Sequence, residues 1–84
     1  MIALTIAIVG HQRRQMLMEC LTSVFKYTRD LTYEVCVVDN ASTDGTADMV
    51  RDYFPQVRLF VNSVPRTFSE NHNFLLHQAQ GRYV

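Results

Sequence analysis

Apolar residues in this chain alternate between short continuous runs and stripes with helical spacing. Runs rich in β-branched residues, each bounded by polar or turn residues, predict buried strands over residues 3–9, 33–38 and 57–61. The clearest helical stripe lies between the first two strands and predicts a helix over about 12–27; it comprises Met16, Leu17, Cys20, Leu21, Val24 and Phe25.

Two further helices complete the alternation. The first contains Ala47, Val50 and Phe54 at helical spacing and ends before Pro55. The second runs to about residue 80, with Thr67 or Ser69 as its N-cap and Gly81 as its C-terminal stop. Residues 82–84 are typical of the start of a fourth strand.

The second strand indicates how these elements pack. Its four consecutive apolar residues, Val35 to Val38, favour a strand covered on both faces, as in a parallel sheet between helix layers. The order β-α-β-α-β-α-(β) therefore predicts a three-layer α/β/α, Rossmann-like fold, formed as one unit over residues 1–84. Ligands of such sheets bind at the carboxyl ends of the strands. Polar clusters follow all three strands there, at residues 10–13, 39–42 and 62–66.

Composition and charge narrow the class of protein. The 84 residues allow one domain, and their 48% apolar content is too high for intrinsic disorder. Eight Lys and Arg residues balance eight Asp and Glu residues, so no long-range attraction to nucleic acid or to an acidic membrane is expected. No apolar run could span a bilayer, and no signal peptide is expected. Two cysteines in apolar patterns favour a reducing, cytoplasmic compartment.

The segment V-C-V-V-D-N-A-S-T-D-G-T, residues 35–46, resembles the V-V-D-N-A-S-x-D-G-T signature of family-2 glycosyltransferases, which have the GT-A fold. The resemblance extends over essentially the whole chain, through Arg13, Arg14, residues 21–24 and 54–59, Phe68, Asn73, Ala79 and residues 81–84. It implies the nucleotide-binding half of an enzyme that transfers a sugar from a nucleotide-diphosphate donor to an acceptor.

The resemblance also implies a nucleotide site. Asp39 matches the carboxylate that accepts a hydrogen bond from the imide N–H of uracil or thymine, so a UDP- or TDP-sugar is expected. The other expected nucleotide-binding residues are Gly10, His11, Gln12, Arg13, Asn40 and Arg66. A purely structural alternative stays open: Asp39 also suits a turn that holds the following amides, and Asn40, Ser42 and Asp44 suit caps and turns.

The family's metal-binding D-x-D motif and its general base are expected beyond Val84. The resemblance therefore implies no catalytic residue and no metal ligand in this chain, and a divalent cation, Mn²⁺ or Mg²⁺, only in full-length members. His72 and His77 are five residues apart, which is poor spacing for a metal site on a helix. The turn Gly10-His11-Gln12, and Thr67 and Leu75 where the family has glycine, depart from the pattern.

Two other interpretations of the sequence stay open. One is a non-catalytic interaction module that docks a partner through an exposed sheet edge. The other is a generic flavodoxin-like domain, against which the 39–46 signature and the lack of a phosphate-binding glycine loop argue. In the GT-A strand order 3-2-1-4, the first strand lies between the second and the fourth. With the fourth reduced to residues 82–84, the open edge predicts a homodimer or larger assembly.

Overall fold

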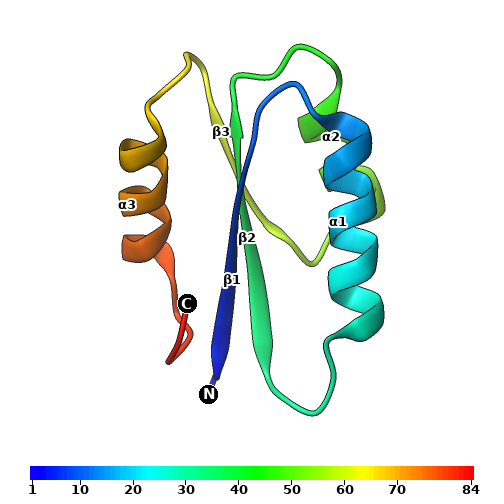
Figure 1. Ribbon diagram of the computed structural model, residues 1–84, viewed down its shortest axis with the longest axis vertical. Coiled ribbons are helices and arrows are strands. Elements are labelled where there is room, and N and C mark those ends of the chain that lie inside the picture. Colours follow the sequence, from blue (N-terminus) through cyan, green and yellow to red (C-terminus); the bar gives the residue numbers. More distant parts are fainter.

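The computed structural model describes all 84 residues. Three strands and three helices alternate along the chain (Figure 1): β1 (Leu4–Gly10), α1 (Arg14–Tyr27), β2 (Tyr33–Asn40), α2 (Thr46–Tyr53), β3 (Arg58–Asn62) and α3 (Phe68–Gln78). The strands are parallel and lie in the order β1-β2-β3. Helices α1 and α2 cover one face of the sheet and α3 covers the other. This arrangement confirms the predicted three-layer α/β/α fold.

The central strand β2 supplies the core on both faces. Val35 and Val37 pack with α1 and α2 around Leu17, Leu21, Met49, Val50 and Val57. Cys36 and Val38 point to the opposite face and pack against Leu75 of α3. The continuous burial of residues 35–38 confirms that both faces of this strand are covered.

Helix α1 buries a narrower stripe than its sequence predicts. Leu17 and Leu21 are buried, whereas Met16 and Cys20 are exposed. These last two residues, with Ile8 of β1, line a cleft of about 240 Å³. Cys20 belongs to the apolar stripe by its spacing but is exposed, because the cleft leaves that side of the helix uncovered.

The end of α3 also differs from the prediction. Of the two predicted N-caps, Thr67 and Ser69, the structure confirms Thr67, which forms a capping box with Glu70. The helix ends at Gln78, and Ala79 rather than Gly81 is its C-cap. Gly81 has a different role: a Cβ atom there would lie 2.5 Å from the backbone nitrogen of Thr5. Glycine is required because two backbones approach each other closely.

That close approach brings the last residues beside β1. Tyr83 forms a parallel bridge with Leu4; Thr5 N donates to Tyr83 O (2.7 Å) and Tyr83 N donates to Ala3 O (2.9 Å). The strand order thus begins 3-2-1, with residue 83 on the far side of β1, as the GT-A resemblance implies. The bridge covers only the start of β1, so the outer edge of residues 6–10 has no strand partner.

A buried carboxylate fastens this end of the molecule. Glu34 Oε2 accepts hydrogen bonds from Thr5 Oγ1 (2.7 Å) and Gln80 N (2.6 Å), and its Oε1 accepts from Arg58 Nη1 (2.9 Å). The same Arg58 nitrogen donates to Gln78 O (2.8 Å). Glu34 thereby joins all three strands to the segment that follows α3. We call these four residues and Gln78 the Glu34 clasp.

The clasp makes stability depend on pH. Burial raises the pKa of Glu34, but the hydrogen bonds it accepts and the charge of Arg58 outweigh burial, so its pKa lies below the ordinary value of 4.5. A carboxylate with a lowered folded-state pKa stabilises the fold above its unfolded-state pKa and ceases to do so as the pH falls through the folded-state value.

We expect Glu34→Gln to lower the free energy of unfolding at pH 7 by roughly 1–3 kcal/mol, because Arg58 loses its charged partner and two donors lose a carboxylate acceptor. The deficit should begin to shrink below about pH 4.5, the ordinary pKa at which the unfolded-state carboxylate becomes protonated, and should vanish once the pH is below the lower folded-state pKa. Urea denaturation between pH 3 and pH 7 measures both effects. Glu19→Gln, at an exposed position of α1, is the matched control. An equal loss at every pH would contradict this account.

Candidate functional site

Three loops meet at the carboxyl edge of the sheet. They follow β1, β2 and β3, and the strand register aligns Gly10 with Asp39 and Asn40 with Asn62. The polar clusters predicted from the sequence therefore lie together. Asp39 and Asn40 are still part of β2 rather than of the turn after it. Because side chains alternate along a strand, they point to opposite faces of the sheet.

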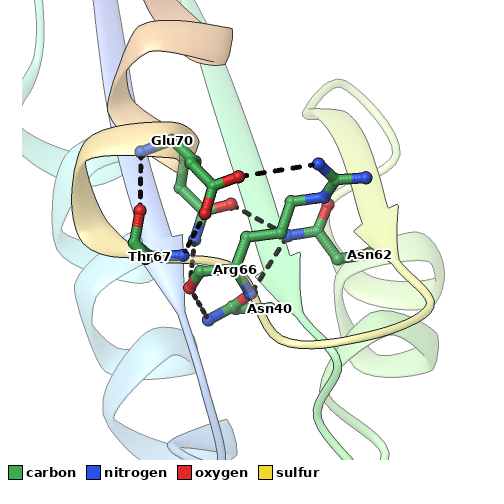
Figure 2. Close-up of polar contacts among 6 residues, drawn as sticks. Asn40, Asn62, Arg66, Thr67 and Glu70 are labelled. Atoms are coloured by element: carbon green, nitrogen blue, oxygen red, sulfur yellow. Dashed lines mark hydrogen bonds and ion pairs between the residues drawn. The ribbon is translucent and has the colours of Figure 1, made fainter.

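Asn40 holds the loop between β3 and α3 (Figure 2). Its Oδ1 accepts from Arg66 N (2.8 Å) and from Asn62 Nδ2 (3.0 Å), and its Nδ2 donates to Arg66 O (3.1 Å). The side-chain amide thus binds both backbone polar groups of Arg66. Asn62 Nδ2 also donates to Asn71 Oδ1 (2.8 Å), which continues the network into α3.

Gln12 holds the loop after β1. Its side chain exchanges two hydrogen bonds with Thr43, one to the hydroxyl (2.8 Å) and one from the backbone nitrogen (3.2 Å). Its own backbone nitrogen donates to Ser42 Oγ (2.9 Å). Gln12 and Ala41 both have positive φ angles, 51° and 59°, which are uncommon for residues other than glycine. The bonds between the two loops offset the cost of these conformations.

Asp44 fixes the starts of two helices. Its Oδ2 accepts from Arg14 N (3.1 Å), and its Oδ1 accepts from the backbone nitrogen (3.2 Å) and hydroxyl of Thr46. The hydrogen bond from the Thr46 hydroxyl is the main reason that the pKa of Asp44 lies below its ordinary value. Asp44 therefore has the capping role that the sequence left open for it.

Asp39 differs from its neighbours because one of its oxygens is free. The residue is 1% exposed, and Oδ1 accepts from Ser42 N (3.2 Å). Oδ2 accepts no hydrogen bond from the protein. Since no fully buried side-chain oxygen in the structure lacks a partner, Oδ2 must still reach solvent. Asp39 thus holds its loop with one oxygen, while the other has no protein partner and only slight contact with solvent.

The remaining predicted residues of this edge are His11, Gly10 and Arg13. His11 Nδ1 lies 2.5 Å from Asn40 O; because a carbonyl only accepts, Nδ1 carries the proton and Nε2 is an acceptor in the neutral ring. Gly10 is buried at the end of β1, beside Asp39. Arg13 makes no side-chain hydrogen bond; it lines the cleft beside Met16 together with Gly10 and His11, so this cleft adjoins the carboxyl edge at the end of β1.

The sequence analysis missed two residues that shape this edge. Asn62 was included only as part of a polar loop, although an asparagine at the end of a strand, level with Asn40, could have indicated a cross-strand bond. Thr43 was included only as part of a turn. Its pairing with Gln12 spans 31 residues, and no local pattern signals such a contact.

The residues of this chain do not fit a divalent cation. No group of three or more His, Cys, Asp or Glu side chains lies close enough to hold one. Asp44 and Asp39 already accept backbone hydrogen bonds, and Glu70 belongs to the capping box. No step that needs a metal is therefore assigned to these residues. Separately, none of the three helices combines the length and apolar character needed to cross a bilayer.

Comparison with known proteins agrees with this geometry. The fold is that of part of a GT-A glycosyltransferase. The family model described as glycosyl transferase family 2 matches residues 5–84, and the chain belongs to this family. No curated protein matches the sequence.

One solved structure with a similar fold is the mannosyltransferase PcManGT from Pyrobaculum calidifontis, in complex with GDP-Man and Mn²⁺. It is 30% identical, with a TM-score of 0.74 over 92% of this chain. The match covers 24% of the mannosyltransferase, so this chain spans about a quarter of that protein's length.

We expect Asn40→Ala to detach the loop between β3 and α3. The loss of three hydrogen bonds at a half-buried position should lower the free energy of unfolding by about 1–3 kcal/mol. The amide of Arg66 should exchange with solvent faster than in the wild type. Hydrogen exchange followed by NMR measures this, with Asn73→Ala at an exposed position of α3 as the control. Unchanged protection of Arg66 would show that Asn40 does not anchor the loop.

Proposed function

We propose that this chain binds the nucleotide of a nucleotide-diphospho-sugar across the carboxyl edge of its sheet. The observation that carries the proposal is Asp39, a buried carboxylate with one oxygen free at that edge. Membership of glycosyl transferase family 2 supports it, as does the GDP-Man bound by the similar mannosyltransferase. Residues 1–84 are then the nucleotide-sugar-binding half of a GT-A enzyme.

The proposed role of Asp39 is to recognise the base. Uracil and thymine present a single imide N–H between two carbonyl groups, which suits the single free oxygen of Asp39. Guanine presents an N–H and an adjacent amino group, so it too can donate to a carboxylate. Adenine presents a ring acceptor that a carboxylate repels. We propose a UDP- or TDP-sugar as the donor, and the guanine nucleotide of the mannosyltransferase makes GDP the necessary comparison.

The other predicted residues take supporting roles in this proposal. Gly10 provides backbone at the base, and the His11 Nε2 acceptor suits a ribose hydroxyl. Gln12 and Asn40 act by positioning, since their side-chain amides are bound to Thr43 and Arg66. The Arg13 guanidinium makes no hydrogen bond, and that of Arg66 has only a weak, exposed ion pair with Glu70 at 4.0 Å, so both suit stacking on a base or approach to a phosphate.

We propose that the transfer reaction needs residues other than these. Inverting transfer requires a cation at the diphosphate and a base at the acceptor. No cluster of side chains in this chain could hold the cation, and the family resemblance places the general base beyond Val84. The chain by itself should therefore bind nucleotide weakly and transfer no sugar. A cytoplasmic setting is proposed because neither Cys20 nor Cys36 forms a disulfide.

We expect UDP to bind with high-micromolar to millimolar affinity and to shift the amide signals of Gly10, Ser42 and Arg66 in an NMR titration. Asp39→Asn should weaken binding by roughly tenfold, because the charged acceptor is lost. Asparagine keeps an oxygen for the Ser42 amide, so the loop should stay folded. Asp48→Asn, at an exposed position of α2, is the matched control.

GDP and ADP are titrated in the same way, so that the preference for the base can be compared. GDP binding tighter than UDP would reassign the base to guanine. If ADP shifted the same amides as strongly as UDP, base recognition by Asp39 would be wrong.

A second candidate function rests on the open edge of β1. Its outer side is unpaired over residues 6–10, and the exposed Met16 of α1 lines a cleft with Ile8 and Val9 of this strand. Such an edge suits pairing with another chain, and the occupant we propose is a second copy in a homodimer.

Sedimentation equilibrium at tens of micromolar should show a dimer or larger species for this 84-residue chain. Amides on the outer side of β1 should exchange more slowly as the concentration rises, because pairing shields them. A monomer at all concentrations with protected β1 amides would exclude the homodimer.

A further inference from the structure

Thr5 is the one polar side chain in the otherwise apolar strand β1, and it is buried. The strand reads L-T-I-A-I-V-G, and Thr5 is 1% exposed. The parallel register places it level with Glu34 of β2, whose side chain is nearly buried as well. The Thr5 hydroxyl donates to Glu34 Oε2 (2.7 Å). Because buried polar groups cost free energy unless they are hydrogen-bonded, a pair of this kind indicates specific partners.

The partners are two consecutive backbone amides in the segment that follows α3. Gly81 N donates to Thr5 Oγ1 (2.8 Å), and Gln80 N donates to Glu34 Oε2 (2.6 Å). Since the Thr5 hydroxyl gives its proton to the carboxylate, its lone pairs are available to Gly81. Thr5 and Glu34 thus bind main-chain groups that every residue except proline carries. These bonds fix where the segment lies, but they do not select which residues occupy it.

The glycine at position 81 makes that selection. A Cβ atom there would lie 2.5 Å from both the backbone nitrogen and the hydroxyl oxygen of Thr5, and 2.7 Å from the carbonyl carbon of Leu4. Residues 79–84, A-Q-G-R-Y-V, contain a single glycine. A shift of the segment by one residue in either direction would press the Cβ atom of Gln80 or Arg82 against the backbone of β1.

We propose that Thr5, Glu34 and Gly81 form a register lock, in which the two side chains bind the segment after α3 and the glycine permits one alignment with β1. The product of this alignment is the parallel bridge between Leu4 and Tyr83, where the end of the chain returns beside the start of β1 (Figure 1). A slip of one residue turns every side chain of a strand to the other face of its sheet. The lock therefore decides which way each residue of the segment points.

The register lock lies at the amino end of the sheet, but its effect reaches the carboxyl edge. Because the bridge is parallel, the chain at Val84 runs along β1 in the direction of Gly10. Residues that follow Val84 in a longer family member would keep this alignment, so the lock would decide which of them reaches the edge. This inference goes beyond the proposed function and involves no nucleotide, so either can fail without the other.

Thr5→Val removes the hydroxyl and keeps the branched shape of the side chain. We expect the amides of residues 5 and 83, which bond across the bridge, to exchange with solvent roughly 5- to 30-fold faster, the factor for one or two lost hydrogen bonds. Thr5→Ser keeps the hydroxyl and should restore the protection. Hydrogen exchange followed by NMR measures both. Thr22→Val on α1, where the hydroxyl donates to Met18 O, is the matched control.

A second variant tests the alignment itself. Combining Gly81→Arg with Arg82→Gly moves the glycine one residue along the chain without changing the composition. We expect the NOEs between residues 4 and 83 to disappear, and NOEs between residues 4 and 84 to take their place. The matched control combines Arg82→Tyr with Tyr83→Arg, which exchanges two exposed residues and leaves the glycine at position 81. In this control the bridge should stay at residue 83.

Three results would each overturn the register lock. The first is wild-type exchange of the bridge amides in Thr5→Val, and the second is an equal increase in Thr22→Val. The third is a bridge that stays at residue 83 after the glycine has been moved. The variant with the moved glycine changes only residues 81 and 82, so it decides the question even if Thr5→Val does not fold. Binding of UDP through Asp39 is measured separately, and neither its presence nor its absence changes these outcomes.

Discussion

The burial of β2 on both faces is the constraint on which the rest of the molecule depends. Residues 35–38 lie between two helix layers, so this strand can carry polar side chains only toward its ends. Glu34 at one end fastens the last residues of the chain to the sheet. Asp39 and Asn40 at the other end organise the loops. The strand thus separates an end that stabilises the fold from an end that is available for binding.

At the binding end, most of the signature segment forms architecture. Asn40, Ser42, Thr43 and Asp44 each bind a loop or helix start that lies 26–31 residues away in sequence. Only Asp39 presents an oxygen that the protein does not use. A signature of this kind can therefore be shared among proteins with different ligands, because its residues preserve the shape of the edge while a few exposed groups select what binds there.

The sequence predicted the features that depend on residues close together in the chain. The apolar run at 35–38 and the stripe around Leu17 and Leu21 determine strand and helix by their periodicity, and Thr67 has the side chain and spacing of a cap. The failures involve contacts between distant segments. Gly81 was assigned to a helix end, but its small size serves an approach to Thr5, 76 residues away. Cys20 belongs to the apolar stripe of its helix and is nevertheless exposed, because periodicity does not show where a helix face lacks a partner.

The positive φ angles of Gln12 and Ala41 have a thermodynamic consequence for any ligand of this edge. Conformations of this kind cost of order 1–3 kcal/mol each and persist only where the surroundings impose them. Here the bonds between the loops impose them before a ligand arrives. The loops have thus already lost the conformational entropy that binding would otherwise remove, so a small number of contacts can yield measurable affinity. Residues outside the contact surface can then set how tightly a ligand of this edge is held.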